Sequence, residues 1–269
     1  MPSFAASLFR LPAVIGLVAA VTLSGCATPP TDPDELAAYK ENNDPLEPMN
    51  RYFFEVNYAL DELLIKPVAS WYDAILPTPV EHSVHNFLRN LNGPVIFAND
   101  VFQGKMNRAG ITAKRFLINS TLGVAGLFDV AADWFDLKYH DEDFGQTLAV
   151  WGVDEGPYLV VPVLGPSNPR DLAGKGVDSV IDPWGYVFAH YDVDELSYVR
   201  TALEGIDLRA RNLDTLDAIR KGAVDYYATM RSLYRQHRND AIKDGENAND
   251  PVATLHFDTP SDPQVTQSN

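Results

Sequence analysis

Apolar positions recur every three or four residues along most of the chain, a period typical of amphipathic α-helices. An early apolar stripe runs from Met49 to Leu63 and meets Pro67, where we expect a kink or an end. The next helix begins at residues 78–81, whose order Thr-Pro-Val-Glu combines a capping residue, a proline in the first turn and a glutamate three residues after the cap. The order Asn-Gly-Pro at residues 92–94 predicts its end.

Shorter helices are predicted for residues 94–103, 106–120 and 122–134. In the last of these, Gly123 and Gly126 allow either close packing or a break.

The longest apolar stripe runs from Leu196 to Leu233 in steps of three and four residues. An unbroken helix there would be roughly 57 Å long at 1.5 Å per residue. Such a length predicts a ridge or brace, and Gly205 and Gly222 are the positions where it could be interrupted.

One region favours strands. Residues 146–151 and 158–163 are short and rich in β-branched and aromatic side chains, and a glycine-containing turn separates them, which predicts a β-hairpin. Pro162 places the second arm at a sheet edge, and residues 164–169 are expected to form a loop. Gly152 and Gly156 flank the acidic turn and suggest a mobile element; a static hairpin is the alternative. The fold is therefore predicted to be mainly α, with a small β-hairpin and a long C-terminal helix.

The N-terminus has the layout of a secretory signal peptide. Arg10 is the only charged side chain before Cys26, and residues 11–23 are almost wholly apolar. The order Leu-Ser-Gly-Cys at residues 23–26 is typical of a lipobox, so residues 1–25 are predicted to be removed and Cys26 to carry a covalent lipid. A structural cysteine beside an ordinary cleavage site is the alternative. Cys26 is the only cysteine, so no internal disulfide can form.

Composition divides the rest of the chain. Residues 26–43 are predicted to form a lipidated tether, residues 44–240 a helical domain and residues 241–269 a disordered tail. With 21 basic against 37 acidic residues, the net charge of −16 argues against nucleic acid as a partner. No later run is apolar enough for a membrane-spanning helix, so membrane contact is expected through acyl chains and apolar faces. Ala27, in place of an aspartate, favours the outer membrane over the inner.

No arrangement of residues indicates catalysis. The sequence lacks the Gly-x-Ser-x-Gly, His-Glu-x-x-His and phosphate-loop motifs. His82 and His85 are expected to be surface or packing histidines, and residues 140–143 a solvated acidic loop instead of a calcium site. We therefore expect neither an enzyme nor a metal centre, and no cofactor besides the lipid on Cys26.

Several motifs, taken in order, resemble the MlaA/VacJ family of lipoproteins. They lie at residues 43–51, 97–100, 103–105, 115–116, 119–123, 142–147, 156–158, 164–167, 170–171 and 182–183, and the first of them continues in Phe53, Asn57, Asp61, Lys66 and Pro67. The N-terminal signature comprises Asp44, Pro45, Glu47, Pro48, Asn50 and Arg51. Asp44 could cap a helix there, or the helix could start at Glu47 because Pro48 disturbs the earlier start. We expect Asn50 and Arg51 to tie this helix to a neighbour; plain solvent exposure is the alternative.

The resemblance covers about residues 42–240 and implies a ring-like or disc-like assembly of amphipathic helices in the outer membrane, facing the periplasm. It also implies retrograde phospholipid transport: lipids misplaced in the outer leaflet pass through the protein to a soluble periplasmic carrier, while trimeric porins hold it in place. An envelope scaffold that binds porins without moving lipid is the alternative. The basic residues Arg231, Arg235 and Arg238 could dock an acidic patch on the carrier, or could serve as cations at a helix C-terminus.

Overall fold

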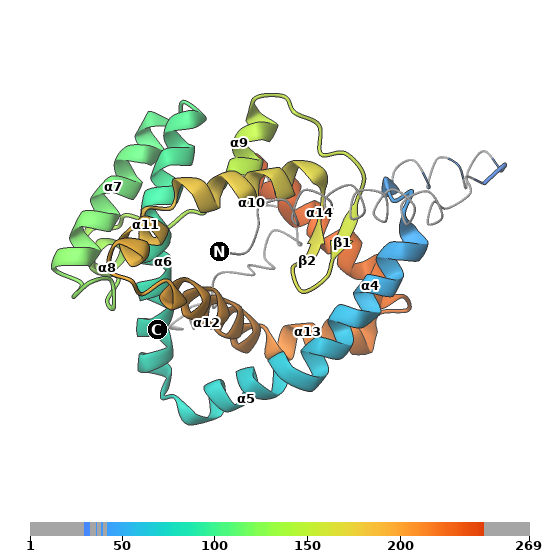
Figure 1. Cartoon of the computed structure of the whole chain (residues 1–269), viewed down its shortest axis with the longest axis horizontal. Coiled ribbons are helices and arrows are strands. Elements are labelled where there is room, and N and C mark those ends of the chain that lie inside the picture. The colour runs from blue at the N-terminus through green and yellow to red at the C-terminus, as the bar shows by residue number, and fades with distance from the viewer. Residues whose placement is uncertain (1–29, 33–35, 37–38, 40–41, 245–269) are drawn as a thin grey trace, which may run out of the picture. The chain divides into compact units, whose positions relative to one another are not determined.

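The computed structural model describes residues 30–32, 36, 39 and 42–244 (Figure 1). These residues fall into two compact units. One unit contains the described residues up to Tyr58 together with Glu155–Pro169, and the other contains Ala59–Asp154 and the chain from Arg170 onward. Cys26 lies outside the described residues. Within the described part of the chain, no helix is long and apolar enough to cross a bilayer.

The first unit combines a helix with a small hairpin. Helix α4 (Glu47–Leu60) begins in it, and strands β1 (Leu159–Val161) and β2 (Gly165–Ser167) pair antiparallel, with Val160 opposite Pro166.

The second unit is built from helices. Its elements are η1, a π-helix (Asp61–Ile65), α5 (Lys66–Ile75), α6 (Thr78–Phe102), α7 (Met106–Thr121), α8 (Val130–Phe135), α9 (Phe144–Val150), α10 (Pro169–Ile181), α11 (Pro183–His190), α12 (Glu195–Arg211), α13 (Leu213–Gly222) and α14 (Tyr226–Ile242). The mainly α fold with one small hairpin is thus confirmed.

Helix α6 continues through the predicted stop. It runs to Phe102 with Pro94 inside it, so the expected end at residues 92–94 was wrong. Gly93 explains this, because it faces α7: a Cβ on Gly93 would lie 3.0 Å from Cδ2 of Phe116. The glycine lets α6 and α7 pack closely side by side (Figure 1), and this packing outweighs the hydrogen bond lost at Pro94.

Two glycine substitutions test this close packing. Gly93→Ala should lower the free energy of unfolding by about 1–2 kcal/mol, because the added methyl group overpacks the contact with Phe116. Gly110→Ala, inside α7, should instead raise it by about 0.5–1 kcal/mol, because nothing lies within 4 Å of the new methyl group. Urea denaturation of both variants measures the difference, and equal effects would contradict the proposed role of Gly93.

The segment after α7 is a turn and not the helix predicted for residues 122–134. Val124, Ala125 and Gly126 all have positive φ angles, and only α8 is helical there. A Cβ on Gly126 would lie 2.5 Å from Cβ of Asn90, so this glycine both packs closely against α6 and lies where the helix is interrupted. Asp129 then caps α8 by accepting the Ala132 N–H at 3.2 Å.

The long C-terminal helix was predicted wrongly, because the apolar stripe is divided among α12, α13 and α14. The first break lies at Asn212, and Gly205 stays helical; the second follows Gly222, which confirms one of the two interruptions that the sequence allowed. Asp225 starts α14 by accepting the Ala228 N–H at 3.1 Å. Helix α14 ends at Ile242, two residues past the boundary expected at residue 240.

The hairpin exists with a different first arm. Residues 146–150 belong to α9, which Asp143 caps by accepting the Gln146 N–H at 2.9 Å. Strand β1 pairs instead with β2, in the segment expected to be a loop. Pro162 follows β1 in the connecting turn, where its missing N–H costs no strand pairing.

The early helix also departs from its expected course. The α-helical pattern ends at Leu60, and η1 joins it to α5 without leaving the helical conformation. Pro67 falls in the first turn of α5, where a missing N–H is tolerated, so it does not end the helical segment.

Candidate functional site

Asn50 links the start of α4 to the hairpin. This fully buried side chain donates from Nδ2 to Oδ1 of Asp44 at 2.7 Å and to the Tyr158 carbonyl at 2.9 Å. Its Oδ1 accepts the Val160 N–H at 2.9 Å. One amide therefore satisfies both a carbonyl and an N–H at the edge of β1.

Asn57 repeats this arrangement two helical turns later. It donates to the Val161 carbonyl at 2.9 Å and accepts the Val163 N–H at 2.7 Å. Residues seven apart lie on one face of a helix, so Asn50 and Asn57 hold β1 and its turn as a neighbouring strand would. Asn57 was assigned no role from the sequence beyond the family resemblance, although the seven-residue spacing of the two asparagines was a usable signal.

Together Asn50 and Asn57 form an asparagine clamp on β1 and the turn after it. The other residues of the signature lie at or just before the start of α4. Helix α4 starts at Glu47, and the Asp44 carbonyl accepts the Glu47 N–H at 3.3 Å. Pro45 lies in the preceding turn and Pro48 in the first turn of α4. Arg51 donates to Glu47 of its own helix at 2.8 Å, and its side chain is 40% exposed. Asn50 thus has the linking position that we expected for both residues, whereas the contact made by Arg51 to Glu47 is local.

Gly152 and Gly156 do not flank the turn of a hairpin. Gly152 follows α9 with a φ of 87°, and Gly156 precedes β1 with a φ of 70°. The acidic segment between them connects α9 to β1, so the prediction that it forms a hairpin turn was wrong, and its mobility stays a prediction. Because the φ of Gly152 is positive and that of proline is fixed near −65°, a proline at this position would strain the backbone.

The basic end of α14 is turned toward the protein's own acidic residues. Arg238 donates to Asp143 at 2.7 Å and to Asp171 at 2.7 Å. Arg231 is buried beside the Tyr227 ring, and Arg235 is half-buried. A docking surface made of Arg231, Arg235 and Arg238 is therefore contradicted, because the charge of Arg238 is neutralised within the fold.

Arg238 also changes the acidity of its partners. Burial alone would raise the pKa of Asp171, but the hydrogen bonds and charge of Arg238 outweigh it, so this pKa lies below its ordinary value. The pKa of Asp143 is lowered in the same way. Both carboxylates therefore stay ionised at neutral pH and hold α14 against α9 and α10.

The acidic segment at residues 140–143 is not the solvated loop that we expected. Glu142 is buried and accepts from Gln103 at 2.7 Å and from Arg108 at 3.1 Å. Lys105 lies 3.4 Å from the same carboxylate. Among the described residues, no group of three or more His, Cys, Asp or Glu side chains is arranged to hold a metal ion.

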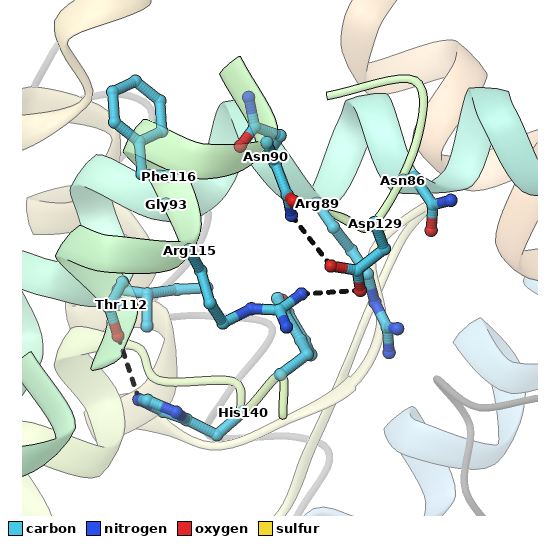
Figure 2. A pocket seen from close by; sticks show the side chains of 12 residues that line it. Asn86, Arg89, Asn90, Gly93, Thr112, Arg115, Phe116, Asp129 and His140 are labelled. Atoms are coloured by element: carbon cyan, nitrogen blue, oxygen red, sulfur yellow. Dashed lines mark hydrogen bonds and ion pairs between the residues drawn. The ribbon is translucent and has the colours of Figure 1, made fainter. Parts of the chain in front are cut away.

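A small polar pocket lies between α6 and α7, with a volume of about 20 Å³ (Figure 2). Arg115 donates to Asp129 across it at 2.7 Å, and Thr112 lies 3.2 Å from Nε2 of His140. The Thr112 hydroxyl donates to Asp100 at 2.7 Å, and the His140 imidazole contacts the same carboxylate at 3.0 Å. Both groups are thus engaged by Asp100.

Large apolar side chains remain exposed along several helices. They include Leu63, Leu64, Trp71 and Ile75 of η1 and α5; Leu122, Val124, Phe128 and Trp134 in the segment from the end of α7 through α8; and Tyr186, Tyr191, Tyr198 and Val199 around α11 and α12. Leu63 and Ile75 are 76% and 75% exposed. Apolar surface of this extent is typical of a face that contacts lipid or another protein.

Comparison with known proteins places these features in a family. The family model described as MlaA lipoprotein matches residues 42–241. The intermembrane phospholipid transport system lipoprotein MlaA of Haemophilus influenzae is 31% identical over 232 residues, covering 86% of this chain and 90% of that protein. The protein of the same name from Escherichia coli is 33% identical over 227 residues, covering 83% and 85%.

A solved structure agrees with the sequence comparisons. It concerns the structural basis for maintenance of bacterial outer membrane lipid asymmetry, and the two chains are 33% identical with a TM-score of 0.65. The match covers 74% of this chain and 98% of the other. The matched family model spans both the asparagine clamp on β1 and the Arg238 cluster, so this chain belongs to the MlaA lipoprotein family.

Proposed function

We propose that this protein is the outer-membrane lipoprotein of an intermembrane phospholipid transport system. The observation that carries the proposal is the family match over residues 42–241, together with relatives of nearly the same extent that are named for phospholipid transport. In this role the protein removes phospholipids misplaced in the outer leaflet and passes them to a soluble carrier in the periplasm. The scaffold alternative is not favoured, because these relatives are named for moving lipid.

The exposed apolar side chains support a place in the membrane. Leu63 of η1 and Trp71 and Ile75 of α5 are all exposed, and contact with hydrocarbon would remove their apolar surface from water, which is favourable. A lipid on Cys26 would anchor the chain, with residues 26–43 as its tether. Trimeric porins are proposed to hold the protein in place.

The proposed function needs no catalysis. The relatives are named as transport lipoproteins, and Asp100 engages both Thr112 and His140 of the polar pocket. No cofactor is proposed besides the covalent lipid.

The test is the amount of surface-accessible phospholipid in a deletion strain, complemented with wild type or with Cys26→Ala. We expect deletion to raise outer-leaflet phospholipid, wild type to restore it and the unlipidated variant to fail, because transport needs the protein at the membrane. Both forms should be present in equal amounts. Unchanged outer-leaflet phospholipid after deletion would contradict transport and favour the scaffold, and lysophospholipid as a product would indicate a phospholipase.

A further inference from the structure

Two cavities, one apolar and one polar, lie next to each other along the interface between α6 and α12. The larger has a volume of about 570 Å³ and a mainly apolar wall; the smaller, of about 170 Å³, is lined largely by charged side chains. Leu88 of α6 lines both. On α12 the apolar cavity spans Leu196–Leu203 and the polar cavity spans Glu204–Arg211, so the change in chemistry occurs between adjacent residues.

The apolar cavity offers few hydrogen bonds to an occupant. Phe87, Leu91, Val199 and Phe188 line it, and the polar groups in its wall already have partners. The Trp184 indole donates to the Leu91 carbonyl at 2.8 Å, and Asn90 donates to the Ser120 hydroxyl at 2.9 Å. Water would gain little in such a space, so an apolar occupant is favoured.

The entrance to this cavity is open. Val199 lines it and is 57% exposed, and Leu196 beside it is 45% exposed. A flexible hydrocarbon chain can therefore enter from outside without unfolding the helices around the cavity.

The polar cavity holds charges of both signs. Asp207 contacts Nδ1 of His85 at 2.8 Å and Nε of Arg211 at 3.1 Å, and Glu204 accepts from Arg200 at 3.0 Å. Arg89 and Asp141 complete the charged lining. Arg200 lies on the wall toward the apolar cavity and also donates to Asp182 at 2.6 Å, so the polar cavity itself has two guanidinium groups and three carboxylates.

His85 adds no positive charge to the lining of the polar cavity. Burial lowers the pKa of its imidazole more than Asp207 raises it, so the ring is neutral at pH 7. With two guanidinium groups and three carboxylates, the lining carries a net charge of −1, and both signs of charge are present at close range.

We propose that the two cavities form one binding site for a single phospholipid, with an acyl chain in the apolar cavity and a zwitterionic phosphoethanolamine headgroup in the polar cavity. This inference rests on the proposed function and names the lipid class and the residues that hold it. Arg89 and Arg211 are placed for the phosphate, and Glu204 and Asp141 for the ammonium group. A net-anionic phosphoglycerol headgroup would add a second negative charge to a lining that already carries a net charge of −1, which is unfavourable in a partly buried site, whereas a zwitterionic headgroup adds none.

The acyl-chain half is tested by filling the apolar cavity. Purified full-length protein in detergent is incubated with mixed micelles containing equal amounts of phosphatidylethanolamine and phosphatidylglycerol, and bound lipid is counted by native mass spectrometry. Val199→Trp should reduce bound phospholipid about tenfold. Val180→Trp, the same substitution at a 62% exposed position on α10 that lines neither cavity, should bind as much as wild type. Leu196→Trp repeats the test should Val199→Trp fail to fold.

The headgroup half is tested by the ratio of the two lipids. Wild type should bind mainly phosphatidylethanolamine. Glu204→Gln keeps the shape of the side chain and removes one negative charge, so the bound ratio should move at least threefold toward phosphatidylglycerol. An unchanged ratio would overturn the headgroup assignment.

The outcomes separate this inference from the proposed function. If Val199→Trp and Leu196→Trp bind lipid as wild type does, while wild type still clears surface phospholipid in the deletion strain, the site is wrong and the transport function stands. A wild-type protein that neither binds phospholipid nor clears it from the surface would overturn both.

Discussion

Arg238→Ala is expected to lower the free energy of unfolding by about 3 kcal/mol at pH 7, because it leaves Asp171 and Asp143 without the guanidinium group that neutralises them. Most of the loss should come from Asp171, whose side chain is only 5% exposed. Asp143 keeps about a third of its surface in water, which places the total at the lower end of the range for a broken buried ion pair. Urea denaturation measures the change.

The pH dependence of this difference identifies its cause. The folded-state pKa of both carboxylates lies below the unfolded value, so their stabilising effect is present above about pH 4 and is lost as the pH falls through the folded pKa. In Arg238→Ala, protonation instead relieves two unpaired charges. The gap between wild type and variant should therefore narrow from pH 7 to pH 3.5.

Arg220→Ala is the matched control. Arg220 contacts Glu62 at 3.1 Å, but its side chain is 44% exposed, so its removal should cost less than about 1 kcal/mol. A loss from Arg238→Ala as small as this, or one independent of pH, would contradict the role assigned to the cluster.

The course of the helices could be predicted only where local signals decide it. The apolar period located α7 to within a residue, and residues 78–81 marked the start of α6. The stop at residues 92–94 failed because Gly93 makes a tertiary contact with Phe116 that no local pattern shows. The stripe from Leu196 to Leu233 has the right period throughout, but a period does not reveal a change of direction such as that at Asn212.

Charged residues were the hardest to interpret, because a sequence shows a charge and not its partner. Arg238 meets carboxylates 67 and 95 positions away, and Glu142 meets Arg108 at a separation of 34. From its neighbours in the sequence alone, Arg238 was interpreted as part of a basic docking surface, and Glu142 as part of a solvated acidic loop. Asn50 and Arg51 were given the same linking role from their place near the helix start, but only Asn50 contacts β1; the sequence does not show which of two neighbouring polar residues faces a partner.

Asn50→Ala is expected to lower the free energy of unfolding by about 2–4 kcal/mol, because the buried Tyr158 carbonyl and Val160 N–H both lose this hydrogen-bond partner. The effect should be local as well, with amide hydrogen exchange at Val160 rising by at least about tenfold.

Arg51→Ala, one residue further along α4, is the control and should change stability by no more than about 0.5 kcal/mol, because its 40% exposed side chain pairs with Glu47 in the same helix. Asn57 still binds Val161 and Val163 in both variants, so the hairpin is loosened at one end and not released. Unchanged exchange at Val160 in Asn50→Ala would show that β2 alone holds the strand. Raised surface phospholipid in Asn50→Ala but not in Arg51→Ala would connect the clamped hairpin to lipid transport.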